Sequence, residues 1–159
     1  MTRFPNERIT GTETLGLAMT SEDNPFADLD SWRELGVHWH AYMTTRPRGK
    51  SPQPGQGVGD RDKRLAQTPL AVLRSPREVE QWIDKQTREY VEPVEVRAGS
   101  EWVRVGDEAD LAHLRRANYR IACRGDSIYT DIYSSSTHHD LYVESVTDDQ
   151  CTNTACKNV

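Results

Sequence analysis

Two histidines one residue apart are the side chains of this sequence best spaced for chemistry. His38 and His40 flank Trp39 in a segment, residues 37–43, in which hydrophobic and polar side chains alternate. This alternation is typical of a half-buried strand, whose every second side chain points to the same face. Both imidazoles would then lie on one face, about 7 Å apart along the strand, where one divalent metal ion can bridge them. Our first expectation is a protein without a cofactor; in the alternative, His38 and His40 bind one divalent metal ion.

The triplet His38-Trp39-His40 also resembles the His-hydrophobic-His signature of rolling-circle replication initiators and relaxases. In that family the two histidines bind a divalent metal beside a tyrosine that attacks a DNA phosphate. The resemblance implies that Tyr90, at the end of a helix predicted over residues 76–90, is the nucleophile of this chain. The alternative interpretation is a solvent-facing strand that carries two ordinary histidines.

The cysteines offer a second set of metal ligands, but their spacing argues against a zinc knuckle. Four residues separate Cys151 from Cys156, whereas two separate the cysteines of a knuckle. The chain has only one further cysteine, Cys123, and so odd and sparse a set predicts reduced thiols rather than a disulfide framework. We expect Cys151 and Cys156 to lie in a frayed polar tail over residues 148–159.

The segment of residues 44–67 follows directly after the two histidines. It contains three prolines and four glycines, which predicts a long mobile loop. Gly49-Lys50-Ser51 resembles the end of a phosphate-binding loop, but the prolines after it exclude the helix that such a loop requires. The segment holds the basic stretch of the chain: Arg46, Arg48, Lys50, Arg61, Lys63 and Arg64. These cations could contact nucleic-acid phosphates, or the loop could solubilise the protein or contact its own acidic N-terminal region.

Aromatic side chains divide between the two faces of the predicted strands. Trp32, Trp39 and Trp82 fall on faces that we expect to be buried. Four tyrosines fall on the opposite side: Tyr42, Tyr129, Tyr133 and Tyr142. If helices cover only one face of the sheet, these tyrosines form an exposed surface for a protein partner, or else an ordinary cross-strand ladder.

The elements that must position these side chains follow from periodicity, caps and turn residues. Ser75-Pro76-Arg77-Glu78 matches a capping box and predicts the helix over residues 76–90. Asn24 and Pro25 predict the start of an earlier helix, which Gly36 would end. The predicted strands are residues 8–20, 37–43, 69–74, 94–98, 102–105, 119–124, 127–133 and 141–146.

A weak internal repeat relates residues 28–43 to residues 110–125, which align without a gap. Each copy predicts a helix, a tight turn and a strand, with Gly36 and Asn118 at the two turns. Asp107 is the expected cap of the second helix. The repeat indicates either a duplicated unit or simply the binary pattern that helix-turn-strand segments share.

Several strands are joined by loops too short for a crossover helix, which favours an α+β fold with a mainly antiparallel sheet. We expect about three helices on one face of this sheet. A chain of 159 residues is long enough for one ordinary domain, here residues 1–147 followed by the polar tail.

Composition and charge narrow the function only in broad terms. The net charge is −5, and no apolar run approaches the roughly 18 residues of a membrane span, which predicts a cytoplasmic protein that does not contact membranes. We predict a small interaction protein without catalytic activity, such as a regulator, an inhibitor or an immunity-type protein, that binds a protein partner. The alternatives are metal-dependent binding or cleavage of single-stranded nucleic acid, and a structural subunit of a larger assembly.

Overall fold

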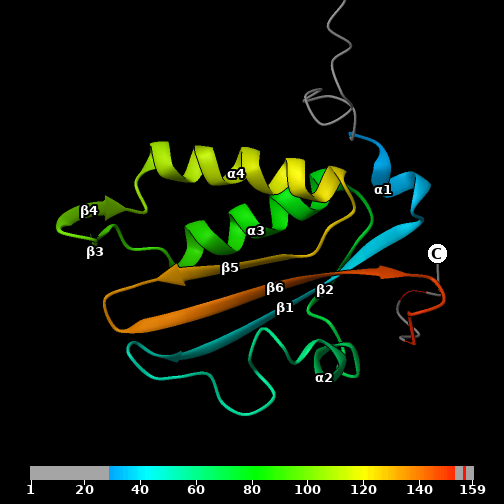
Figure 1. Ribbon diagram of the computed structural model, residues 1–159, viewed down its shortest axis with the longest axis horizontal. Coiled ribbons are helices and arrows are strands. Elements are labelled where there is room, and N and C mark those ends of the chain that lie inside the picture. Colours follow the sequence, from blue (N-terminus) through cyan, green and yellow to red (C-terminus); the bar gives the residue numbers. More distant parts are fainter. Residues whose placement is uncertain (1–28, 153–155, 157–159) are drawn as a thin grey trace, which may run out of the picture.

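The chain has an α+β fold, which a computed structural model describes over residues 29–152 and residue 156. A four-stranded antiparallel sheet carries two long helices on one face, and a two-stranded hairpin lies beyond one end of these helices (Figure 1). The described elements are α1 (Ser31–Glu34), β1 (Val37–Pro47), α2 (Arg61–Leu65), β2 (Ala71–Leu73), α3 (Pro76–Tyr90), β3 (Val94–Ala98), β4 (Glu101–Val105), α4 (Glu108–Cys123), β5 (Ile128–Tyr133) and β6 (Thr137–Thr147). The predicted fold class is confirmed. The strand predicted over residues 8–20 and the helix start at Asn24 lie outside the described residues.

The sheet has the strand order β2-β1-β6-β5 and is built around a long ladder between β1 and β6. The ladder runs from Val37 opposite Thr147 to Pro47 opposite Thr137. Both strands extend beyond their predicted ranges, because each supplies hydrogen-bond partners to the other along its whole length.

The main core lies between the sheet and the two long helices. Trp39 and Ala41 of β1 and Val143 of β6 have no exposed surface, since alternate strand positions point toward the helices. They pack against buried residues of the neighbouring elements: Leu73, Val79, Ile83, Ala122, Ile128, Ile132 and Leu141. The Trp39 indole also donates a hydrogen bond to the carbonyl of Asp126 at 3.0 Å, so its one polar atom is satisfied inside the core.

Helix α3 has the range that its capping residues predict. Ser75 Oγ accepts a hydrogen bond from the backbone N–H of Glu78 at 3.2 Å, and the Glu78 carboxylate accepts one from the N–H of Arg74 at 2.7 Å. Pro76 occupies the first helical position, where no hydrogen bond is lost. Val79 and Ile83 place the apolar face of the helix in the core.

The predicted strand over residues 119–124 is wrong, because helix α4 continues through it to Cys123. Asp107 caps this helix as predicted, by accepting a hydrogen bond from the N–H of Asp110 at 2.9 Å. Asn118 is buried in the middle of the helix, and the left-handed residue after it is Gly125, with φ 83°. The same apolar positions fit a helix that packs on α3 and the sheet. The second copy therefore lacks the turn that Gly36 makes in the first.

The segment of residues 44–67 is not one long loop. Residues 44–47 belong to β1, and α2 lies within the remainder, on the sheet face opposite α3 and α4 (Figure 1). The segment packs because Arg64 of α2 is nearly buried, with 3% of its surface exposed. The predicted frayed tail also needs correction: Cys151 is buried, and its N–H donates to the carbonyl of Thr147 at 3.1 Å. None of the described helices is long and apolar enough to span a membrane.

Candidate metal centre

The sheet face opposite α3 and α4 is lined with polar and aromatic side chains. His38, His40 and Tyr42 of β1 alternate with the core residues of that strand, and they lie opposite Val146, Glu144 and Tyr142 of β6. Residues 55–67, which we name the α2 segment, and the residues after β6 cover this face, so both histidines are buried, with 6% and 2% of their surface exposed. A buried sheet face with this many titratable groups is a candidate functional site.

Four metal-binding side chains converge at one end of this face. We name them the His–Cys cluster: His38, His40, Cys151 and Cys156. One ligand atom from each lies within 4.8 Å of all the others. His40 Nε2 is 3.2 Å from His38 Nε2, 2.9 Å from Cys156 Sγ and 3.6 Å from Cys151 Sγ. The cluster joins the first strand of the sheet to the residues that follow its last strand in the chain.

These separations suit one tetrahedral ion. Zinc binds imidazole nitrogen at about 2.0–2.1 Å and thiolate sulfur at about 2.3 Å. Tetrahedral angles then require about 3.3 Å between two nitrogens and about 3.6 Å between a nitrogen and a sulfur. Two of the observed separations, 3.2 Å and 3.6 Å, agree with these values, and the third, 2.9 Å, is shorter.

Both imidazoles turn Nε2 toward the cluster and Nδ1 toward an outer partner. Asp148 Oδ1 lies 3.6 Å from His38 Nδ1, and Tyr42 Oη lies 3.4 Å from His40 Nδ1. Metal-binding histidines generally have such partners, because a group at the second nitrogen fixes the ring orientation and the tautomer. The outer contacts therefore leave the same nitrogen of each ring directed at the cluster.

The pKa values of the cluster determine which of its side chains must lose a proton to bind a metal ion. Burial, the neighbouring His38 and Arg61 lower the pKa of His40 to about 4. Burial also lowers the pKa of His38, although Asp148 opposes this effect. The imidazoles are thus neutral, which is the form that binds metals. Burial and the contact with Cys151 raise the pKa of the Cys156 thiol to about 11, so a bound metal would displace its proton.

The metal prediction therefore named two of the four residues that the fold brings together. The spacing of a zinc knuckle argues against Cys151 and Cys156 as ligands, yet a separation of four residues lies within the range of structural zinc sites. A turn after β6, in which the N–H of Cys151 donates to the carbonyl of Thr147, brings Cys151 to the sheet face that carries the two histidines. The sequence signal that could have found the site is His-x-His combined with Cys-x4-Cys, the two pairs coming from opposite ends of the sheet-forming region.

A buried ion pair adjoins the His–Cys cluster. Glu144, directly opposite His40, has no exposed surface and accepts hydrogen bonds from Arg64 Nε at 2.8 Å and Arg64 Nη2 at 2.6 Å. Arg61 approaches the second carboxylate oxygen at 3.4 Å, and Tyr129 Oη donates to it at 2.8 Å. These contacts account for the burial of the α2 segment, because a buried carboxylate requires compensating charge and hydrogen bonds.

Most of the cations predicted to contact nucleic acid are engaged within the protein. Arg61 and Arg64 pair with Glu144, Arg46 pairs with Asp140 at 3.0 Å, and Lys63 pairs with Asp60 at 2.8 Å. Arg48 and Lys50 are exposed where the chain leaves β1. The basic stretch is therefore mainly a set of internal ion pairs, and a nucleic-acid contact through Arg48 and Lys50 stays a prediction.

The four tyrosines lie on the predicted face, but the expected exposure is wrong for two of them. Tyr42 and Tyr142 have 5% and 3% of their surface exposed. The α2 segment covers them: Tyr142 Oη donates to the carbonyl of Gln56 at 2.6 Å, and the Arg64 guanidinium lies 4.1 Å from the centre of the Tyr142 ring. Tyr129 is exposed and Tyr133 is half-buried, and their contact with a partner stays a prediction.

Tyr90 does not lie beside the histidines of β1. Its ring stacks on His139 with 4.4 Å between the centroids, and His139 lies opposite Thr45 on the helix-covered face of the sheet. The position that the rolling-circle signature implies for Tyr90, next to the two metal-binding histidines, is therefore wrong.

A second group of potential ligands is already bound to a cation. Asp131, His138 and Asp140 also place one ligand atom each within 4.8 Å of the others. Arg46 donates to both carboxylate oxygens of Asp140, at 3.0 Å and 3.2 Å, and its Nη2 lies 3.3 Å from His138 Nε2, so a guanidinium already contacts two members of this group. The His–Cys cluster remains the candidate site.

The chain matches no protein-family model, no curated protein and no solved structure. The geometry of the His–Cys cluster is therefore the basis for its proposed function.

Proposed function

We propose that this protein binds one zinc ion at the His–Cys cluster, and that it acts by binding a protein partner rather than by catalysis. The observation that carries the zinc proposal is the convergence of two imidazole nitrogens and two thiol sulfurs within 4.8 Å. Two thiolates with two imidazoles in a tetrahedral arrangement suit zinc, whereas Mg²⁺ and Ca²⁺ prefer oxygen ligands.

The number of ligands supports a structural ion rather than a catalytic one. Catalytic zinc sites keep one position open for water or substrate, while structural sites use four protein ligands. All four ligands of the His–Cys cluster come from the chain, and the two histidines are buried. The ion would fasten the residues after β6 to the start of β1.

A non-catalytic role agrees with the surroundings of the cluster. Glu144 is the acidic side chain directly opposite His40, and Arg61 and Arg64 hold it as an ion pair. A carboxylate held in this way is poorly suited to accept a proton from water. A regulator, an inhibitor or an immunity-type protein with a protein partner stays our proposed class.

The zinc proposal is tested by the metal content of the protein, purified without a metal-affinity tag. We expect one zinc ion per chain by elemental mass spectrometry. Replacing zinc with Co²⁺ should give the visible absorption of a tetrahedral ion and a thiolate charge-transfer band. His38→Ala and Cys151→Ala should each lose most of the metal, because three ligands hold zinc less tightly than four.

Matched control variants separate loss of a ligand from loss of a residue type. Cys123→Ala removes a buried thiol of α4, and His113→Ala removes an exposed imidazole of the same helix. Both should keep the full metal content. A protein that contains no zinc and gives no tetrahedral Co²⁺ spectrum, or a Cys151→Ala variant that retains its metal, would contradict the proposal.

A further inference from the structure

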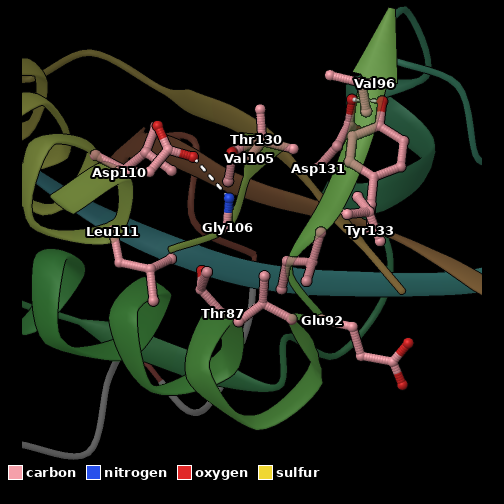
Figure 2. Close-up of a pocket in the computed structure, with 14 residues that line it drawn as sticks. Thr87, Glu92, Val96, Val105, Gly106, Asp110, Leu111, Thr130, Asp131 and Tyr133 are labelled. Carbon is pink, nitrogen blue, oxygen red and sulfur yellow. Dashed lines mark hydrogen bonds between the residues drawn. The ribbon is translucent and has the colours of Figure 1, made fainter. Parts of the chain in front are cut away.

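The outer edge of the sheet at β5 is a candidate site separate from the His–Cys cluster. Among the described residues, β5 pairs with β6 on one side and with no strand on the other. A pocket of about 320 Å³ lies along this outer edge, and residues 130–133 of β5 form part of its lining (Figure 2). The helices α3 and α4 and the β3–β4 hairpin supply the other walls. We name it the edge pocket.

The backbone of β5 presents hydrogen-bonding groups along the outer edge. The Tyr133 carbonyl accepts a hydrogen bond from the N–H of Glu92 at 3.2 Å, so the backbone of Tyr133 faces away from β6. Backbone groups point alternately to the two sides of a strand, and those of Asp131 and Tyr129 therefore face the same way. Within the described part of the chain, no backbone hydrogen bond outside the β5–β6 ladder involves Tyr129 or Asp131. Their outward N–H and C=O groups are open to another strand.

The chain itself makes one hydrogen bond to this edge and then turns away from it. Strand β3 begins at Val94, two residues after Glu92, but it pairs with β4 and not with β5. Gly106 fixes the position of the hairpin: its φ is +86°, and a Cβ atom there would lie 2.9 Å from Val91 Cγ2. Its N–H donates to Asp110 Oδ2 at 2.9 Å, the bond drawn in Figure 2. The edge pocket is the space left between β5 and the diverging hairpin.

The walls that face the outer edge of β5 are mainly apolar. The lining contains three valines of the hairpin and two leucines of α4: Val94, Val96, Val105, Leu111 and Leu114. None of the hairpin residues is buried, and Leu114 is 39% exposed. An occupant of the edge pocket would remove this apolar surface from water.

The side chains of β5 show which positions of an added strand would reach the pocket. Ile132 lies in the core on the helix-covered face of the sheet, and Thr130 lies on the same face. A residue placed opposite either of them would direct its side chain into the edge pocket. The residues between would lie beside Tyr129 and Tyr133 on the other face, the two tyrosines that we predict to contact a partner.

We propose that the outer edge of β5 binds an extended segment of the protein partner, which adds to the sheet as a strand and fills the edge pocket with apolar side chains at alternate positions. Backbone hydrogen bonds supply affinity in such a pairing, and pockets for alternate side chains supply specificity. A small apolar molecule would fill the pocket but leave the outward backbone groups of Tyr129 and Asp131 without a partner. The inference rests on the proposed function only in taking a protein as the partner, and it makes no use of the His–Cys cluster.

The probe is a fluorescein-labelled peptide in which three valines alternate with two threonines, with a lysine at each end for solubility. We expect saturable binding of one peptide per chain by fluorescence anisotropy. Two methylated forms test strand pairing: one is N-methylated at both threonines, and the other at the second and third valines. Alternate amides of a strand point to opposite sides, so only one of the two forms should lose binding, by at least about tenfold.

Two substitutions of one residue separate the backbone of β5 from its side chains. Asp131→Pro removes an N–H that faces the outer edge and leaves the bonds to β6, since proline is tolerated on an edge strand. It should weaken peptide binding by at least about tenfold, whereas the matched control Asp131→Asn keeps the N–H and should bind as the wild type does. Should circular dichroism show that Asp131→Pro fails to fold, Val96→Phe fills the pocket from β3 and should weaken binding by a similar factor.

Three outcomes would overturn the inference: no saturable binding, equal binding of the two methylated forms, or equal binding by Asp131→Pro and Asp131→Asn. A dimer in sedimentation equilibrium that Asp131→Pro dissociates would instead assign the edge to a second copy of the chain. Zinc content is measured on the same samples. A failure of the peptide to bind would leave the zinc proposal standing, and an absence of zinc would leave the strand proposal standing.

Discussion

Glu144 is the most deeply buried charge among the described residues, and its surroundings explain why a polar sheet face can be covered. Its carboxylate is satisfied by Arg64, Arg61 and Tyr129. The Arg64 guanidinium also lies over the Tyr142 ring, at 4.1 Å from its centre. A buried ion pair of this kind adds little net stability compared with apolar side chains. Removal of one partner, however, strongly destabilises the folded protein.

Arg64→Ala should therefore lower the free energy of unfolding by about 3–5 kcal/mol, since it removes both arginine hydrogen bonds to Oε1 of the buried Glu144 and leaves Arg61 and Tyr129 at Oε2. Urea unfolding followed by circular dichroism measures the change. The control Arg48→Ala removes an exposed arginine next to the same segment and should change stability by less than about 0.5 kcal/mol. Equal effects of the two substitutions would show that the α2 segment does not depend on this ion pair.

Asp140 gives a pH-dependent contribution to stability. Burial raises the pKa of Asp140, but its contacts with Arg46, Asp131 and His138 outweigh this effect and hold the pKa below the ordinary 3.8. A lowered folded-state pKa stabilises the protein above the unfolded-state value, and this stabilisation disappears as the pH falls through the folded-state value. Arg46→Gln should cost about 1–2 kcal/mol at neutral pH.

The difference between wild type and Arg46→Gln should then shrink as the pH falls below about 4. Urea unfolding between neutral pH and pH 3 measures it, with both proteins stripped of metal so that metal loss in acid does not contribute. Arg48→Gln serves as the control and should show no such trend. A difference that stays constant down to the lowest pH would rule out the Arg46–Asp140 contact as its source.

At the scale of elements, sequence predicts best where local contacts decide the structure. Helix α3 has its predicted range because Ser75, Pro76 and Glu78 act within one turn. Asn118 predicts an early end of helix α4 because asparagine resembles a turn residue, whereas burial against α3 and the sheet keeps the segment helical. The covered sheet face could not be predicted, since the contact of Arg64 with Glu144 spans eighty residues.

The sequence predicts two of the four residues of the candidate site, because local contacts decide the position of only those two. His38 and His40 share a strand, so their common face follows from the period of that strand alone. The position of Cys151 and Cys156 depends on how β6 pairs with β1, which places Val146 opposite His38. A local spacing rule cannot supply that register.

The segment after β6 should respond to removal of the metal. We expect a chelator to increase hydrogen exchange in residues 148–152, while the β1–β6 ladder stays protected, because the ion fastens only the former. The thermal midpoint should fall with the chelator, since zinc at a thousand times its dissociation constant stabilises by about 4 kcal/mol. Cys151→Ala should show neither response. Equal protection of residues 148–152 with and without chelator would argue against a metal tether.

The whole molecule divides its stabilising interactions between the two faces of one sheet. The face toward α3 and α4 is a conventional apolar core around Trp39, whereas the other face holds ion pairs, a guanidinium over a tyrosine ring and the His–Cys cluster. Hydrophobic residues make up 35% of the chain, and a structural ion compensates for a modest core in many small domains.

The position of the cluster has a topological consequence. His40 and Cys151 are 111 residues apart, so a bound ion would close the described chain into a ring that contains every strand of the sheet and both long helices. A backbone cut at one place within such a ring, for example between residues 51 and 59, would not release either fragment. The ion and the β1–β6 ladder would both join the two pieces, so the nicked protein would migrate as one particle in denaturant alone or in chelator alone, and would separate when both are present.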